Sequence, residues 1–123
     1  MKVRGIDFVG ITFGPDTNVR DVARFYRDML GVDAAFIAGD GEADKWTEFD
    51  TRPVALALIK WIGAGSVIAL AVDDVRAAVE ELRPKGVKVL YEPTEFNVCW
   101  MAAIEDPWGN RLILHARKDG TVG

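Results

Sequence analysis

The strongest constraint on the fold of this chain is an internal repeat. The pattern strand–helix–strand–strand–strand occurs over residues 5–61 and again over residues 65–117. In both copies the helical pattern ends at a Gly-Val pair, at 31–32 and at 86–87. A period of about 55 residues in only two copies is unlike a solenoid. We therefore predict one α+β domain over residues 1–123, built from two βαβββ modules that share a curved sheet.

Both predicted helices have start and stop signals. The first begins after Asn18, with Asp21 three residues later, and ends at Gly31, which suits a helix C-terminus. Its predicted apolar face consists of Val19, Val22, Phe25, Tyr26, Met29 and Leu30. The second begins after Asp73 or Asp74 and ends near Pro84. Its predicted apolar stripe consists of Val75, Ala78, Val79 and Leu82.

The strand patterns alternate between bulky and small apolar residues. The bulky set should pack against the helices, because alternate residues of a strand face opposite sides of the sheet. It consists of Val9, Ile11, Phe13, Val54, Leu56, Leu58, Ile68, Leu70, Val72, Leu112 and Leu114. The opposite face carries Phe8, Gly10, Thr12, Ala55, Ala57, Ile59, Val67, Ala69, Ala71 and Ile113. A face open to water would be polar, so we expect a ligand, a partner subunit, or both to cover it. A dimer interface without a ligand is the alternative.

Composition narrows the class of partner. The chain has 19 acidic and 15 basic residues, and the basic ones are scattered, which disfavours a nucleic-acid binder. Cys99 is the only cysteine, so no intrachain disulfide can form, and we expect a buried, inert thiol in a reducing compartment. We find no signal-peptide pattern and no apolar run of membrane-spanning length. These features predict a cytoplasmic protein that binds neither nucleic acid nor membrane.

Three segments resemble a known family. "DVARFYRDMLGV", "IALAVDDVRAAVEELRPKGVKV" and "MAAIEDPWGNRLILH" are similar to segments of the glyoxalase/bleomycin-resistance/dioxygenase proteins, the vicinal oxygen chelate superfamily. The resemblance runs from about Gly5 to Ala116. It implies two βαβββ modules forming a cup-shaped mixed sheet with the helices on its outer face.

The resemblance also implies where a metal would bind. Metal-dependent members take ligands from the first and last strands of each module, and those positions here are Phe8, Ala55, Val67 and Ile113. None of these side chains can coordinate a metal. The chain has a single histidine, so one subunit cannot supply a site of two histidines and a carboxylate. We therefore predict no metal, no cofactor and no catalytic residue of the family type.

The remaining members of the family resemble sequestering proteins. We accordingly predict a homodimeric, metal-free protein that binds a hydrophobic or aromatic small molecule, such as a drug or metabolite, in the manner of bleomycin resistance proteins. The predicted ligand-binding residues are Phe8, Thr12, Trp46, Glu48, Ala55, Ala57, Ile59, Trp61, Val67, Ala69, Trp100, Arg111, Ile113 and His115. Whether the chain is an enzyme stays open. One alternative is a lyase, isomerase or dioxygenase-like enzyme with a non-standard or subunit-shared site built from Glu48, Arg111, His115 and the acidic loop 39–45. Another is a structural or regulatory dimer whose cup is filled by its own side chains.

Some of these residues have a specific expected role. Trp46 and Glu48 share a strand face and could together meet a cation, although an edge carboxylate in water is the alternative. Arg111 could point to the rim of the cup, and His115, near the end of the last strand, is expected at that rim. The loop "GDGEADK", residues 39–45, could cover the groove or bind a cation weakly.

Overall fold

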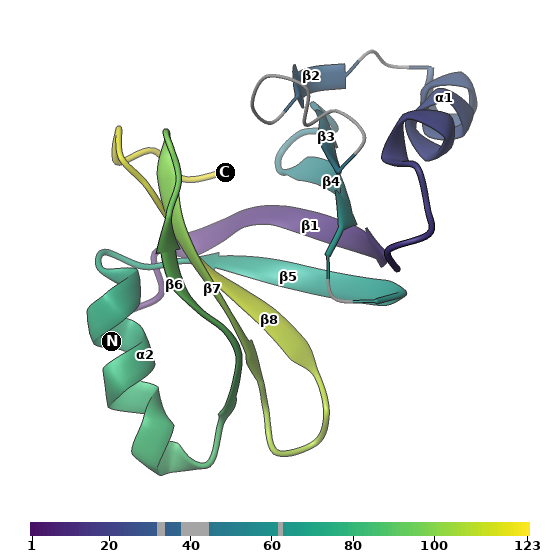
Figure 1. Cartoon of the computed structure of the whole chain (residues 1–123). Coiled ribbons are helices and arrows are strands. Elements are labelled where there is room, and N and C mark those ends of the chain that lie inside the picture. The colour runs from purple at the N-terminus through teal and green to yellow at the C-terminus, as the bar shows by residue number, and fades with distance from the viewer. Residues whose placement is uncertain (32–33, 38–44, 62) are drawn as a thin grey trace. The chain divides into compact units, whose positions relative to one another are not determined.

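The computed structural model of the protein describes residues 1–31, 34–37, 45–61 and 63–123 (Figure 1). Its contacts divide the chain into two compact units. The first module contains Phe8–Ser66, and the second contains Val67–Gly123 together with Met1–Asp7. The division follows the predicted repeat except at the start, where the first seven residues belong to the second module. Strand β1 (Gly5–Phe13) therefore contributes residues to both modules.

The first module is a four-stranded sheet with one helix. After β1 it contains α1 (Val19–Leu30), β2 (Ala34–Ile37), β3 (Trp46–Phe49) and β4 (Ala55–Lys60). The strand order is β2-β3-β4-β1. Strands β1 and β4 are parallel, whereas β3 pairs antiparallel with both β4 and β2.

The second module repeats this topology. It contains β5 (Gly65–Ala71), α2 (Val75–Leu82), the 3₁₀ turn η1 (Arg83–Lys85), β6 (Lys88–Glu95), β7 (Cys99–Glu105) and β8 (Arg111–Arg117). The strand order is β5-β8-β7-β6, with β5 and β8 parallel and the other pairs antiparallel. Each module thus places its last strand beside its first. The predicted α+β class and the two βαβββ modules are confirmed.

The helix boundaries follow the capping residues. The side chain of Asn18 accepts a hydrogen bond from the backbone N–H of Arg20 at 2.9 Å, and Gly31 ends α1 with a φ of 69°. A left-handed residue at that position favours glycine, which has no Cβ to clash. The side chain of Asp74 accepts from the N–H of Ala77 at 3.1 Å and begins α2.

Each module has a core between its helix and one face of its sheet. The core of the first module consists of Val19, Ala23, Phe49 and Leu58, with Ile11, Phe13, Val22 and Tyr26 packed against it. The core of the second consists of Val72, Val75, Ala78, Val79, Ala102, Ile104 and Leu114, and the residues packed against it include Leu70, Leu82, Trp100 and Leu112. The predicted stripe of α2 is confirmed. Most of the stabilisation in each module comes from this burial of apolar area.

The predicted apolar face of α1 is only partly correct. Phe25 is 63% exposed and Met29 57%, whereas Val19 is fully buried. The helix contacts its core through Val19, Ala23 and Tyr26, at spacings of four and three residues. Phe25 lies on the neighbouring flank and makes an edge-to-face contact with Tyr26, with ring centroids 5.5 Å apart. No helix in the described part of the chain is long and apolar enough to span a membrane.

Candidate functional site

In each module we call the sheet face that points away from the helix core the inner face. In the first module, Phe8 pairs with Ala55, and Thr12 and Trp46 both pair with Ile59. Residues paired across neighbouring strands lie on the same side of a sheet. The inner face of this module therefore carries Phe8, Gly10, Thr12, Trp46, Glu48, Ala55, Ala57 and Ile59. The predicted residues of the first module that lie within strands thus share one face.

An aromatic pair with an attached carboxylate occupies this face. The rings of Phe8 and Trp46 meet edge to face, with centroids 5.5 Å apart. The indole Nε1–H of Trp46 donates to Oε1 of Glu48 at 3.2 Å. Phe8 is fully buried and Trp46 is half-buried, so Phe8 supports the Trp46 ring from within, and the Trp46 ring is the accessible part of the pair. Trp61 follows β4 and is half-buried, and its backbone N–H donates to the carbonyl oxygen of Phe13 at 3.1 Å.

The inner face of the second module is also apolar. Ala69 and Ala103 pair with Ile113, and Ala71 and Met101 pair with His115. All six of these residues are buried. Val67 and Arg111 lie on the same face by strand alternation, Val67 buried and Arg111 half-buried. The inner face thus holds the predicted residues of this module except one.

Trp100 is that exception, and its predicted place in the cup is wrong. It pairs with Ala116, on the same side as Leu114, and packs against the core beneath α2. The guanidinium of Arg76 on α2 lies 4.4 Å from the centroid of the Trp100 ring. The sequence pattern indicated that Trp100 lies on a strand but did not indicate which face of the sheet its side chain occupies.

The four positions that the family resemblance assigns to metal ligands hold hydrocarbon side chains. Phe8 and Ala55 are direct neighbours in the first module, and Val67 and Ile113 are buried on the inner face of the second. A divalent cation needs nitrogen, oxygen or sulfur donors, so these residues do not fit a metal of the family type. Across the described ranges, no group of three or more His, Cys, Asp or Glu side chains is arranged to hold a metal ion.

A buried ionic cluster in the second module was missed by the sequence analysis. Asp7 is fully buried, and its Oδ2 lies 2.6 Å from Nδ1 of His115. Its Oδ1 accepts hydrogen bonds from Nη1 of Arg117 at 3.2 Å and from the backbone N–H of Gly123 at 3.1 Å. The one visible signal is that Asp7 is the sole charged residue in the otherwise apolar segment of β1.

This cluster also corrects the expectation for His115. The side chain is not at an exposed rim, because His115 is only 5% exposed. Burial by itself raises the pKa of the Asp7 carboxyl, but hydrogen bonds from His115 and Gly123 and the positive charge of Arg117 hold that pKa below its ordinary value. Asp7 is therefore a carboxylate at neutral pH, and its charge is matched by Arg117.

The other predicted features lie apart from these faces. Trp108 is 83% exposed on a turn in which Oδ1 of Asp106 accepts from the N–H groups of Trp108 and Asn110, both at 2.9 Å. Of the acidic loop 39–45, only Lys45 lies within the described residues. Cys99 is buried, as expected.

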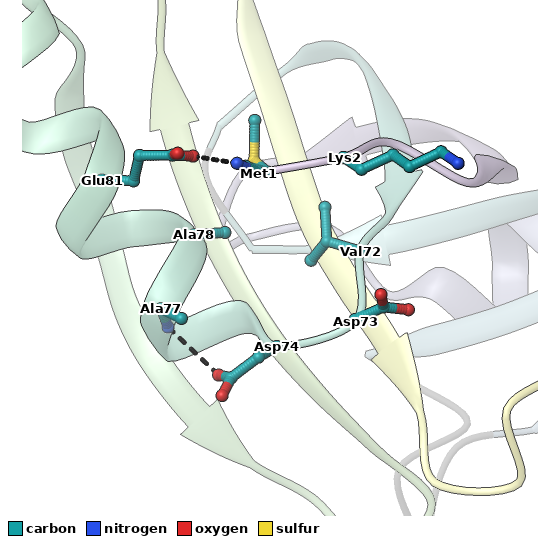
Figure 2. Close-up of a pocket in the computed structure, with 8 residues that line it drawn as sticks. All are labelled: Met1, Lys2, Val72, Asp73, Asp74, Ala77, Ala78 and Glu81. Carbon is teal, nitrogen blue, oxygen red and sulfur yellow. Dashed lines mark hydrogen bonds and ion pairs between the residues drawn. The ribbon is translucent and has the colours of Figure 1, made fainter.

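A pocket of about 260 Å³ lies at the start of α2 (Figure 2). Two of its carboxylates have partners within the protein: Glu81 pairs with the amino group of Met1, and Asp74 caps the helix. It is lined by Met1, Lys2, Val72, Asp73, Asp74, Ala77, Ala78 and Glu81. None of the predicted ligand-binding residues lines this pocket, so it is separate from the inner faces.

Two modules of identical topology, each with an apolar inner face, define a duplicated βαβββ protein. The chain belongs to the Glyoxalase/Bleomycin resistance protein/Dioxygenase superfamily, whose family model matches residues 12–114. No curated protein matches it.

Several solved structures share the fold. A Streptomyces coelicolor methylmalonyl-CoA epimerase in complex with 2-nitronate-propionyl-CoA has a TM-score of 0.70 at 22% identity, over 99% of this chain and 100% of that one. A hypothetical protein from Bacillus halodurans also has a TM-score of 0.70, at 17% identity over 96% and 97% of the two chains. The Mn(II)-bound glyoxalase from Novosphingobium aromaticivorans has a TM-score of 0.63 at 21% identity, over 99% of this chain and 41% of that one. At these identities the likeness establishes the fold alone.

Proposed function

We propose that this protein is a metal-free binder of hydrophobic or aromatic small molecules, acting in drug or metabolite sequestration, and that it works as a homodimer. The observation that carries the proposal is the chemistry at the four family ligand positions, which hold Phe8, Ala55, Val67 and Ile113. The inner faces keep the apolar character that a ligand site needs but carry no metal donor at these positions.

The edge-to-face pair of Phe8 and Trp46 supports an aromatic ligand. A rigid aromatic surface loses little conformational entropy when a flat molecule stacks on it. Glu48, held by the indole of Trp46 at 3.2 Å, adds a negative charge beside that surface. A flat molecule with a cationic group would match both features.

A thermal-shift screen against aromatic, cationic and polyketide-like compounds tests the proposal, combined with metal analysis of the purified protein. A ligand that binds only the folded state raises Tm. We expect a rise with aromatic compounds that Trp46→Ala reduces. The matched control is Trp108→Ala, which removes the same side chain from an exposed turn and should leave the shift unchanged.

Stoichiometric zinc, nickel, manganese or iron that survives dialysis would contradict the metal-free proposal. No shift with any compound class would leave a structural dimer as the better account.

A second candidate is an enzyme that acts on the inner face without a metal. The pairing of His115 with Asp7 at 2.6 Å favours it, because a carboxylate that orients an imidazole is an arrangement used for proton transfer. Solved structures of similar fold include methylmalonyl-CoA epimerases. Incubating the protein with carbonyl compounds in heavy water would separate the two functions. Catalysed deuterium incorporation that His115→Phe abolishes would establish the enzyme, whereas a binder leaves the compounds unlabelled.

A further inference from the structure

One flank of α1 carries apolar side chains that remain exposed. Phe25 is 63% exposed and Met29 57%, and Val22 next to them is half-buried. The spacings of three and four residues put these side chains in one continuous row along the helix. We call this row the exposed flank of α1. Single apolar residues on a surface are common, but a row of them on one helix is typical of a contact surface.

The central ring of this flank is held in place before any partner binds. The rings of Phe25 and Tyr26 meet edge to face, with centroids 5.5 Å apart and planes at 89°. Tyr26 in turn packs against the core of the first module. A ring that is already oriented loses little conformational entropy in a contact, and aromatic side chains provide much of the binding energy of interfaces.

Charged residues of both signs run along one border of the exposed flank. Nη1 of Arg24 lies 3.7 Å from Oδ1 of Asp21, and Asp28 follows one turn later on the same side of the helix. All three side chains are exposed. The two carboxylates disfavour an anionic lipid surface as the occupant of the flank. The order acid–base–acid instead suits a helix that has the same order and runs in the opposite direction.

We propose that the exposed flank of α1 is a dimer interface, in which α1 of a second copy packs antiparallel against it. The proposal names the contact for the homodimer that is part of the proposed function, and it rests on that function. A two-fold axis brings the same surface patch of both copies together. With this axis between Phe25 and Tyr26, Val22 of each copy lies opposite Met29 of the other, and the two Phe25 rings meet at the centre.

The same register pairs the charges. Along the helix axis, Arg24 of one copy comes within one residue, about 1.5 Å, of Asp28 of the other. Each guanidinium then lies between Asp21 of its own chain and Asp28 of the second copy, and the symmetry repeats this contact. Because the border is exposed, these charges determine the orientation of the two helices more than the strength of their association. A contact of two helices is also smaller than the roughly 800 Å² per partner of a stable complex, so the dimer should be reversible.

Sedimentation equilibrium over a range of protein concentrations tests the apolar contact. Phe25→Glu puts a charge at the centre of the interface and should raise the Kd of the dimer at least about tenfold. Met29→Lys is a second disruption, and circular dichroism would show that both variants keep the fold. The control is Trp108→Glu, which replaces an aromatic residue with the same charge at an 83%-exposed turn position and should leave the Kd unchanged.

A mixing experiment tests the antiparallel register. Arg24→Asp brings carboxylates together across the interface, and Asp28→Arg brings guanidiniums together, so each variant alone should dimerise more weakly than the wild type. In an equal mixture, one chain is acidic and the other basic at both positions, so both contacts become attractive. We expect the mixture to associate about fivefold more tightly than either variant alone, the scale of two exposed ion pairs. The control is Arg20→Asp, which makes the same charge change on the opposite flank and should dimerise like the wild type.

The outcomes distinguish this interface from the function on which it rests. A dimer whose Kd is unchanged in Phe25→Glu would overturn the interface and leave the proposed homodimer standing. A mixture that associates no more tightly than its components would overturn the antiparallel pairing. A chain that stays monomeric at every concentration would overturn the interface and the homodimer together, while the thermal-shift screen judges ligand binding separately.

Discussion

Oδ2 of Asp7 lies 2.6 Å from Nδ1 of His115, although the two residues are 108 positions apart in the chain. The contact joins the start of β1 to the end of β8 within the second module. It links a fully buried carboxylate to the only histidine of the chain. The pair therefore joins a buried ion-pair cluster of this module to a residue of its inner face.

Removing the Asp7 carboxylate should destabilise the protein strongly. Asp7→Ala removes the fully buried carboxylate that accepts from Arg117 and faces Nδ1 of the buried His115, while the half-buried Arg117 keeps only the carbonyl oxygens of Gly123 and residue 7. Loss of one partner of a buried ion pair costs about 3–5 kcal/mol. Urea unfolding would measure this loss. Asp73→Ala is the control, because its exposed ion pair with Arg4 should be worth less than about 1 kcal/mol. Equal effects of the two changes would contradict the structure.

The contribution of Asp7 should disappear in acid. Its pKa is lower in the folded protein than in the unfolded chain, so the folded state binds this proton less readily. The stabilisation is therefore complete above the unfolded value of about 4 and decreases as the pH falls toward the folded pKa. The difference in unfolding free energy between wild type and Asp7→Asn, measured from about pH 5 down to about pH 3, reports on this carboxyl because all other carboxyls are shared. A difference that grows as the pH falls would show the opposite sign of the pKa shift.

The two flanks of α1 should respond differently to truncation. Leu58→Ala removes a fully buried side chain beneath the helix and should cost about 2–5 kcal/mol. Phe25→Ala removes a larger side chain that is 63% exposed and should change stability by less than about 1 kcal/mol. Thermal or urea unfolding would compare them. A larger loss for Phe25→Ala in the isolated chain at low concentration would mean that α1 packs through its other flank.

The contact between Arg76 and Trp100 should affect stability without affecting ligand binding. Arg76→Ala removes the cation that lies 4.4 Å from the Trp100 ring and should cost about 0.5–1 kcal/mol. Ligand-induced thermal shifts should stay as large as in the wild type, because both residues lie on the helix side of the sheet. A reduced ligand shift in Arg76→Ala, alongside an unchanged shift in Trp46→Ala, would reverse this assignment of faces.

Much of the fold could be predicted from the periodicity of apolar residues and from the residues that begin and end helices. The duplicated pattern, the caps at Asn18 and Asp74, and the alternation in β1 and β4 are local signals that tertiary packing did not override. The stripe of α1 was overestimated because the sequence contains two adjacent apolar flanks and cannot indicate which one meets the sheet.

The candidate site was less predictable for a physical reason. The register of β7 against β8 places Trp100 opposite Ala116, and a shift by one residue would have moved it to the other face. Such a register depends on long-range pairing, which local patterns do not encode. The contact of Asp7 with His115 likewise joins residues 108 positions apart, and only the isolated charge in an apolar strand indicated it.

The division of β1 between two modules has a consequence for dissecting the protein. A fragment cut at the boundary of the repeat, starting at Gly65, would contain α2 and β5–β8 but would lack Asp7. Arg117 and His115 would then be left without the carboxylate that neutralises one and orients the other. The half that looks like an independent copy in the sequence is thus not self-sufficient: residues Met1–Asp7, which precede the first module in the sequence, supply the buried carboxylate of its interior.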